Sequence, residues 1–315
     1  MKRVGITIGD INGIGVEVIL KALAYGRWSK ETEFILLGSE AVVRKQAEMM
    51  KIPLSRKLRF HDVGVATWRP GQLRVDASRL AVAAIEEGVK QAVTGQLDGL
   101  VTAPVNKLGF QRAGVDVPGH TELLAGLTGS SRYGMMLVGG GLRVMLATRH
   151  LPLKEVPSAI SKAVVREAVE LTYEGLDWLE VSPQSIGVCG LNPHAGDGGA
   201  IGMEEKMILN PVLRALAKKG IPVSMALPAD TLFHQALRGE YQAVVAMYHD
   251  QGLAPLKMMG FDEGINVTLG LPIVRTSPDH GTAFGLAGEG VASAKSMREA
   301  IRLALRLADR KNPWT

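Results

Sequence analysis

The chain has 315 residues, of which 46% are hydrophobic and 5% aromatic, and its formal net charge is +5. This length exceeds what one compact core usually serves, so we expect two α/β lobes. Lys and Arg are scattered and do not alternate with aromatic residues, which argues against nucleic-acid binding, whereas a moderate positive charge suits an enzyme for anionic, phosphorylated substrates.

Strand-like and helical patterns alternate along the chain, which predicts mainly parallel sheets flanked by helices. Strand patterns cover residues 4–9, 33–38, 99–103, 185–191, 221–227 and 243–247, and helical patterns cover residues 15–25, 39–50, 78–93, 164–179, 204–220 and 293–309. Residues 133–148 read as two strands joined by three glycines, which predicts an antiparallel hairpin. Because no linker or repeat divides the chain, we expect the last helix to return to the first lobe.

Targeting signals are absent from the pattern. The apolar run near the N-terminus is interrupted by Asp10 too soon for a signal peptide, and no stretch approaches the roughly 20 apolar residues of a membrane span. The single cysteine, Cys189, excludes an intrachain disulfide and is typical of a buried small hydrophobic residue in a reducing compartment. We therefore expect a cytoplasmic protein without a membrane partner.

Three histidines, His150, His194 and His249, each follow an apolar stretch that reads as a strand. Strands of an open α/β sheet present their ligand sites at one edge, beyond their carboxyl ends. A lone histidine is more often structural, but three at matching positions favour a shared divalent metal ion, which imidazole binds well. Three ligands leave a coordination position open, as in catalytic zinc sites; a metal-dependent hydrolase or lyase and a binding module with a structural metal are the alternatives.

The first strand is followed by a glycine-containing turn, GDINGIGVEV. Backbone N–H groups at the start of the next helix could meet an anion there. The spacing of Gly9, Gly13 and Gly15 is not that of a Rossmann fingerprint, and no acidic residue ends a second strand about 20 positions later. The default interpretation is a tight strand-to-helix turn.

Two further segments offer groups for an anionic substrate. TAPVNK leaves a strand and presents Lys107, which is either catalytic or simply solvated. PGHTE places His120 and Thr121 at the start of a helix, where donors suit a phosphate or carboxylate. Thr121 could equally cap that helix.

Downstream, Lys257, Asn266 and Arg275 precede a glycine-rich loop around His280. Arg suits two-pronged contacts with carboxylate or phosphate, and Lys a point-charge contact, although each could be a surface charge. Asp230 stands at a strand-to-helix junction, either as a helix N-cap or as a carboxylate close to the metal.

These segments together resemble the 4-hydroxythreonine-4-phosphate dehydrogenase family, NAD(P)-dependent enzymes of pyridoxal 5'-phosphate biosynthesis. The resemblance spans nearly the whole chain and rests on GDxxGIGxE, TAPVNK, PGHTE, ATRHLPL, NPHAGDGG, PADTLF, YHDQGL, NVTLGLP and RTSPDHGTA. It implies a two-lobed fold like that of isopropylmalate dehydrogenase, with mainly parallel sheets flanked by helices and the site in the cleft between the lobes. We expect residues 1–125 and 285–315 in the first lobe, and residues 126–284, with the metal ligands and dimer interface, in the second.

The resemblance also implies roles for individual residues. The metal ligands would be His150, His194 and His249, around Zn, Mg or Co in a site shared across a homodimer. The substrate contacts would be His120, Thr121, Lys257, Asn266 and Arg275. NAD or NADP would lie against Asp279, His280, Gly281, Thr282, Ala283, Gly288 and Gly290, as the similarity of HGTAFGLAGEGVA to isopropylmalate dehydrogenases implies.

The implied reaction is the oxidation of 4-phosphooxy-L-threonine at its C3 hydroxyl, followed by decarboxylation to 3-amino-2-oxopropyl phosphate. A divalent ion next to that hydroxyl would favour loss of its proton, and Lys107 or Asp230 would accept the proton. The chain departs from the family where many members have Pro in place of Val16 and DPAGIG in place of DINGIG. These departures keep open a related dehydrogenase for threonate or erythronate 4-phosphate, or for a cis-dihydrodiol.

Overall fold

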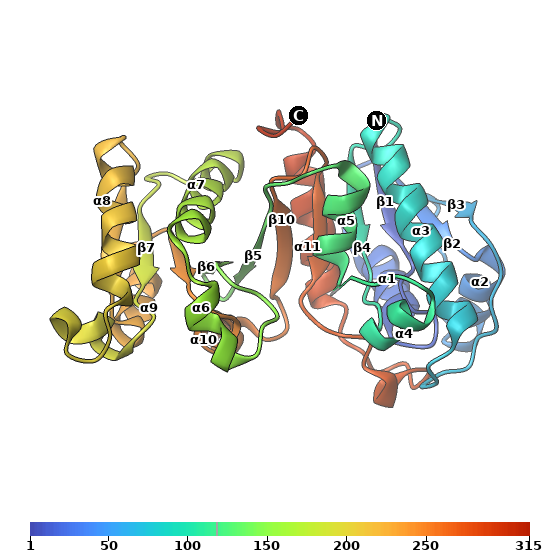
Figure 1. Cartoon of the computed structure of the whole chain (residues 1–315). Helices are drawn as coiled ribbons and strands as arrows, with labels where there is room; N and C mark the ends of the chain where they lie inside the picture. The colour runs from blue at the N-terminus through green and yellow to red at the C-terminus, as the bar shows by residue number, and fades with distance from the viewer. Residues whose placement is uncertain (118) are drawn as a thin grey trace. The chain divides into compact units, whose positions relative to one another are not determined.

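The structure is a computed structural model that describes residues 1–117 and 119–315, and the chain divides into two compact units (Figure 1). Unit 1 contains Met1–Ser131 and Leu271–Thr315, and unit 2 contains Arg132–Gly270. The boundaries therefore differ from those expected at residues 125 and 284. The physical reason is that β11 (Arg275–Pro278) pairs in parallel with β4 (Gly99–Thr102), which moves the segment from 271 to 284 into unit 1.

The sheet of unit 1 has the strand order β3-β2-β1-β4-β11, and all its pairings are parallel. The remaining strands are β1 (Lys2–Thr7), β2 (Thr32–Gly38) and β3 (Leu58–Asp62). The helices are α1 (Gly15–Tyr25), α2 (Glu40–Met49), α3 (Val75–Val93), α4 (Lys107–Arg112), α5 (His120–Thr128) and α11 (Lys295–Leu307), with a 3₁₀ turn at Phe284–Leu286.

Helices cover both faces of this sheet. Gly88 of α3 lies so close to Leu100 that an added Cβ would be 2.8 Å from its side chain, so α3 covers the face to which Leu100 points. Thr276 belongs to the opposite face, and its hydroxyl donates to the carbonyl of Ala300 in α11 at 2.8 Å. Side chains alternate between the faces of a strand, which places α3 and α11 on opposite sides.

Unit 2 has the strand order β10-β5-β6-β9-β7-β8. Its strands are β5 (Gly134–Gly139), β6 (Leu142–Leu146), β7 (Ile186–Cys189), β8 (Val223–Leu227), β9 (Ala243–Ala246) and β10 (Ile265–Leu269). The pairs β10–β5 and β5–β6 are antiparallel, and the pairs β6–β9, β9–β7 and β7–β8 are parallel. The predicted hairpin is thus confirmed: Gly140 and Gly141, both with positive φ, join β5 to β6.

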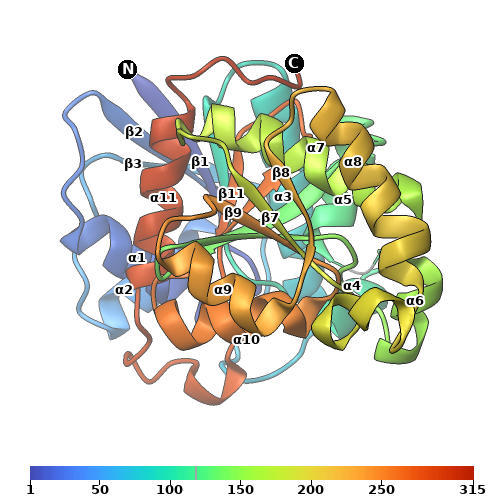
Figure 2. The same cartoon turned by 90° about the vertical axis from the view of Figure 1, so that its left-hand side faces the viewer.

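The helices of unit 2 are α6 (Val156–Ala159), α7 (Lys162–Trp178), α8 (Asn210–Lys218), α9 (Ala229–Leu237) and α10 (His249–Gly260), and short turns occupy Leu153–Glu155, Pro193–Gly199 and Glu205–Leu209. Figure 2 shows α9 and α10 on one side of this sheet and α7 and α8 on the other. The helix expected over residues 204–220 is divided, because Glu205–Leu209 forms a π-helical turn before α8.

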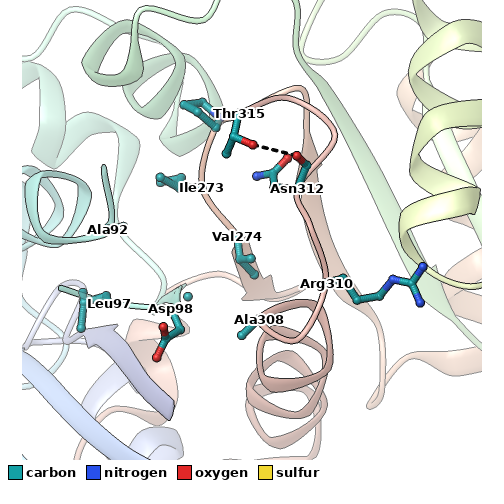
Figure 3. A pocket seen from close by; sticks show the side chains of 11 residues that line it. Ala92, Leu97, Asp98, Ile273, Val274, Ala308, Arg310, Asn312 and Thr315 are labelled. Carbon is teal, nitrogen blue, oxygen red and sulfur yellow. Dashed lines mark hydrogen bonds between the residues drawn. The ribbon is translucent and has the colours of Figure 1, made fainter. Parts of the chain in front are cut away.

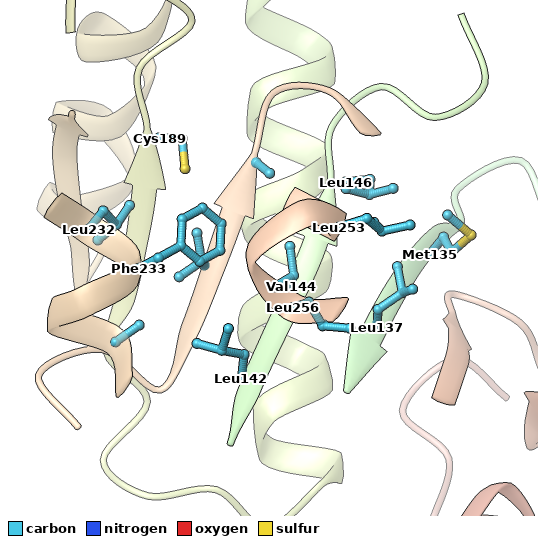
Figure 4. Packing of buried hydrophobic residues seen from close by; sticks show 13 residues of the cluster. Met135, Leu137, Leu142, Val144, Leu146, Cys189, Leu232, Phe233, Leu253 and Leu256 are labelled. Atoms are coloured by element: carbon cyan, nitrogen blue, oxygen red, sulfur yellow. The ribbon is translucent and has the colours of Figure 1, made fainter. Parts of the chain in front are cut away.

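One hydrophobic cluster of unit 2 lies between its sheet and helices α9 and α10 (Figure 4). Leu142, Val144 and Leu146 of β6 pack there with Phe233 of α9 and Leu253 of α10. Burial of such side chains contributes roughly 1.5–3 kcal/mol each, so the ends of β6 and the start of α10 are fixed firmly. His150 and His249 emerge from these two anchored elements. Among the helices that the structure describes, none combines the length and apolar character needed to cross a membrane.

Candidate functional site

A buried cation stands at the start of β11. Arg275 is only 1% exposed, and its Nη2 and Nε donate to the Thr102 hydroxyl at 2.7 and 3.2 Å. Burial lowers the pKa of Arg275 to about 9, and the Glu122 carboxylate opposes this shift. The guanidinium therefore keeps its charge at neutral pH in a setting where solvent screens it little.

His120 begins α5 beside this cation. Burial, and then the charge of Arg275, hold the pKa of His120 well below its usual value of 6.5, so the imidazole is neutral at neutral pH. Its ring lies edge-on to Phe110, with 5.9 Å between the ring centroids. Its buried Nε2 has no hydrogen-bond partner among the described residues, which makes it a group that a polar ligand would satisfy.

Thr121 is buried and follows His120 in α5. The N-cap of this helix is Gly119, and no side chain of the described residues caps it, so the prediction that Thr121 could be the cap is wrong. The open first turn leaves backbone N–H groups at a helix N-terminus next to a neutral imidazole, while Arg275 supplies a cation. Such a set of donors suits a phosphate or carboxylate.

The turn after β1 is joined to the expected cofactor loop. The backbone N–H of Ile14 donates to the carbonyl of Thr282 at 2.9 Å, and Asp10 N–H donates to the carbonyl of Pro104 at 2.9 Å. Gly13 lies so close that an added Cβ would be 2.5 Å from the Thr282 oxygen, so only glycine permits this approach. Backbone hydrogen bonds therefore join the turn to both the TAPVNK segment and the loop within unit 1.

Two buried polar atoms in that turn are unsatisfied by the described residues, Asp10 Oδ2 and Asn12 Nδ2. Burial raises the pKa of Asp10, and the N–H of Asn12, which donates to its other oxygen at 3.0 Å, opposes the shift. A carboxylate oxygen and an amide donor beside a glycine-rich loop fit the hydroxyls of a dinucleotide. Sequence reasoning treated this stretch as a tight turn, because burial of Asp10 depends on segments far away in the chain.

A second acidic residue missed by sequence reasoning anchors the end of the loop. Glu17 of α1 is 2% exposed, and its Oε1 accepts from Ala292 N–H at 2.7 Å and from Lys21 Nζ at 2.7 Å. Lys21 Nζ also donates to the carbonyls of Gly290 and Ala292 at 2.8 and 2.9 Å. This pair fixes the loop that carries Gly288 and Gly290 to the first helix.

In unit 2, His150 and His249 come together. Their ring centroids lie 5.6 Å apart, with 41° between the ring planes. Two imidazoles bound to one ion through N–metal bonds of about 2.1 Å have centroids roughly 4.5–5.5 Å apart, close to this separation. His249 Nδ1 lies 2.7 Å from Asp250 Oδ1, a contact that orients the ring and leaves Nε2 for a metal. The donor set fits a divalent ion.

His194 does not complete this pair within the chain. It is exposed, in the loop after β7, and no group of three or more His, Cys, Asp or Glu residues able to hold a metal occurs in residues 1–117 and 119–315. The simple hypothesis of an intrachain cluster of three histidines is therefore wrong for the described part of one chain.

The remaining expected residues are spread over both units. In unit 2, Asn266 Oδ1 is buried without a partner among the described residues, and Lys257 Nζ lies 6.0 Å from the Phe261 ring centroid. Asp230 is exposed in the first turn of α9, whose N-cap is Pro228, so Asp230 is not the helix cap. Lys107 is exposed at the start of α4 in unit 1.

Residues 28–304 match the family described as pyridoxal phosphate biosynthetic protein PdxA. The chain belongs to this family. The resemblance stated from the motifs is thus confirmed, and the protein is an oxidoreductase of the PdxA family, which implies NAD(P) as its cofactor. Family membership therefore argues against the two alternatives stated from the sequence, a metal-dependent hydrolase or lyase and a binding module with a structural metal.

Relatives of nearly equal identity have different names. A 4-hydroxythreonine-4-phosphate dehydrogenase of Geobacter metallireducens is 41% identical, over 97% of this chain and 95% of that protein. A D-threonate 4-phosphate dehydrogenase of Cupriavidus necator is 39% identical, over 98% of both. Family membership therefore leaves the substrate open.

Solved structures agree with this assignment. A 4-hydroxythreonine-4-phosphate dehydrogenase from Klebsiella pneumoniae superposes with a TM-score of 0.86 at 35% identity, covering 98% of this chain and 100% of that chain. Isocitrate dehydrogenase from Methylococcus capsulatus, at 13% identity and a TM-score of 0.50 over 98% of this chain and 88% of that chain, shares the fold. The predicted fold class, an α/β fold like that of isopropylmalate dehydrogenase with mainly parallel sheets flanked by helices, is confirmed, and the observed strands are mixed but mostly parallel.

Proposed function

We propose that this PdxA-family dehydrogenase oxidises 4-phosphooxy-L-threonine with NAD(P)⁺ and releases CO2 to give 3-amino-2-oxopropyl phosphate, in pyridoxal 5'-phosphate biosynthesis. The observation that carries the proposal is the buried Arg275 guanidinium beside a neutral His120 whose Nε2 lacks a partner among the described residues. 4-Phosphooxy-L-threonine has two anionic ends and a C3 hydroxyl that would satisfy these donors.

Binding roles follow from the chemistry of each side chain. Arg275 pairs with an anionic end of the substrate, and His120 with Thr121 contacts that end or the adjoining hydroxyl. Lys257 and Asn266 provide a point charge and an amide for the remainder of the molecule. Held in this way, the substrate presents its C3 hydrogen to the nicotinamide, so positioning lowers the barrier to hydride transfer.

His150, His194 and His249 would hold one divalent ion, Zn, Mg or Co. The ion would supply Lewis-acid polarisation of the C3 oxygen, which stabilises negative charge there during oxidation and during loss of CO2 from the β-keto acid. The hydroxyl proton leaves to Lys107 or Asp230. Both side chains are exposed, so either can pass the proton on to solvent.

The second candidate substrate is D-threonate 4-phosphate, favoured by the relative from Cupriavidus necator. It has the same phosphate and carboxylate and differs from 4-phosphooxythreonine in its C2 substituent, a hydroxyl in place of an ammonium group. The anion-binding residues above serve both molecules, so selectivity rests on contacts at C2.

One assay separates these proposals. Purified protein with a divalent metal is given each substrate with NAD and with NADP, and NADH or NADPH absorbance is followed. We expect a higher kcat/KM for 4-phosphooxythreonine. Turnover of threonate 4-phosphate alone would refute 4-phosphooxythreonine as the substrate and support the second candidate substrate. If neither compound is oxidised, both candidate substrates are refuted.

We also propose that the metal site is shared across a homodimer, with His194 coming from the other chain. Its support is that His150 and His249 form a pair, whereas the described residues of one chain group no third ligand with them. The His150→Ala and His194→Ala variants should each lack metal and activity, with exposed His234→Ala in α9 as the control that keeps both.

Mixing the two inactive variants tests the sharing directly. In a mixed dimer, one site loses both altered ligands and the other regains all three, so activity returns to at most half of the wild-type value. Ligands that all come from one chain would give no recovery after subunit exchange, and that result would overturn the shared site.

A further inference from the structure

The loop that carries His194 has an unusual backbone. Six consecutive residues from His194 to Gly199 have positive φ, with values of 54° at His194, 52° at Ala195 and 44° at Asp197. These three carry side chains, for which the left-handed region is disfavoured. Such conformations persist only where the surroundings determine them, and they concentrate at functional sites.

The surroundings that determine this loop centre on Glu205. Its side chain is 3% exposed; Oε1 accepts from the backbone N–H of Asn192 at 2.7 Å, and Oε2 accepts from Asn192 Nδ2 at 3.0 Å. The carbonyl of Asn192 in turn accepts from Ala195 N–H at 3.1 Å. The Glu205 carboxylate therefore holds both the backbone and the side chain of Asn192, two residues before the left-handed run begins.

Glycines allow the carboxylate to press against the loop. A Cβ added to Gly196 would lie 2.6 Å from Glu205 Oε2, and one added to Gly190 would lie 3.1 Å from Oε1 and 2.7 Å from Ala195 Cα. Only residues without a side chain leave room for these contacts. The loop therefore packs closely around the buried Glu205 carboxylate.

The local helix geometry directs Glu205 into this position. Glu205 begins the π-helical turn that ends at Leu209, where a regular α-helix was expected from the sequence. Inserted π turns alter which side chains face a given neighbour, and they often occur at functional sites. The neighbouring Glu204 accepts from the side-chain amide of Asn192, Nδ2 to Oε2 at 2.8 Å, and among the described residues it does not bond to the Asn192 backbone.

We propose that Glu205 is a positioning residue for the metal: by holding Asn192 and the left-handed turn, it presents the exposed His194 imidazole in the orientation that binds the ion. The inference rests on the proposed function, in which His194 is a metal ligand. Glu205 is not one of the proposed metal ligands or substrate contacts, and it acts through the backbone between Asn192 and Ala195.

The test measures Co²⁺ affinity by calorimetry and by cobalt absorbance, independently of turnover, on the full-length protein. Glu205→Ala should weaken Co²⁺ binding about tenfold, the range seen when groups that orient metal ligands are lost. At saturating Co²⁺ its kcat should return to near the wild-type value, because the ligands themselves remain. Glu204→Gln, a neighbouring change that leaves the Asn192 backbone bond intact, should bind Co²⁺ as the wild type does.

Glu205→Gln provides the second variant. It keeps an acceptor for the Asn192 backbone N–H and turns a donor toward Asn192 Nδ2, so its Co²⁺ affinity should fall about threefold, between wild type and Glu205→Ala. If Glu205→Ala does not fold, as thermal unfolding would reveal, Glu205→Gln decides. Wild-type Co²⁺ affinity in the folded Glu205 variants, with binding lost in His194→Ala, would overturn the positioning role alone. Retained Co²⁺ binding in His194→Ala would overturn the proposal that His194 is a metal ligand, on which the positioning role rests.

Discussion

The bond between Arg275 and Thr102 allows a quantitative prediction. Thr102 is fully buried, and its hydroxyl accepts from two donors of the Arg275 guanidinium, at 2.7 and 3.2 Å. Thr102→Val replaces that hydroxyl with a methyl group of similar size. The change removes an acceptor from a buried cation and introduces no cavity, so its effects report on the hydrogen bonds.

A hydrogen bond to a charged group contributes about 1.5–3 kcal/mol. Taking about 2 kcal/mol for the pair, because the second bond is long, we expect the free energy of unfolding to fall by about 2 kcal/mol. Without the Thr102 acceptor the guanidinium is held less firmly toward the substrate anion, and the same energy corresponds to an increase of roughly 30-fold in the substrate KM.

Denaturant unfolding measures the first quantity, and nucleotide absorbance at varied substrate concentration measures the second. Thr102→Ser, which keeps the hydroxyl, should hold KM within a few fold of wild type. A Thr102→Val protein with wild-type stability and wild-type KM would refute the reasoning, because the orientation of Arg275 would then not depend on this acceptor.

Other regions give independent predictions. Burial raises the pKa of the Cys189 thiol, so native protein should not react with a disulfide reagent within minutes, while unfolded protein should release one equivalent of chromophore. Glu17→Gln should raise the nucleotide KM several-fold at unchanged substrate KM. A nucleotide KM equal to that of the wild type would contradict the anchoring of the loop. Unfolded His120 binds a proton below about pH 6.5 and the folded protein does not, so stability should fall as pH drops from 6.5, and His120→Asn should flatten this dependence in denaturant titrations. Gly13→Ala should destabilise by about 1–3 kcal/mol in thermal unfolding, because its Cβ would meet the Thr282 carbonyl.

Local patterns predicted much of the fold. The alternation of strands and helices and the hairpin of β5 and β6 were readable, because periodicity and three successive glycines are properties of neighbouring residues. The unit boundary near residue 271 could not be predicted from local patterns, because β11 pairs with β4, more than 170 positions away along the chain. A strand of four residues carries no mark of the sheet it joins.

The same distinction holds for the site. The position of Arg275 among turn residues and of His120 at a helix start could be read from motifs. The lowering of the His120 pKa by Arg275 could not, because it depends on their contact in the folded chain. Asp10, Glu17 and Glu205 look like ordinary surface acids in sequence, since their burial depends on remote or irregular segments. A signal was present in the glycines around them, which mark close approach of backbone.

The division of the chain into two units has a consequence for biosynthesis. Unit 2 is a continuous stretch, Arg132–Gly270, and it can fold while synthesis is still in progress. Unit 1 is assembled from the two ends, and until Leu271–Thr315 has emerged, β4 exposes the edge that β11 later covers. Nascent chains therefore carry an open, apolar strand edge while more than half of the protein is being made, a stage at which chaperones would protect them from aggregation.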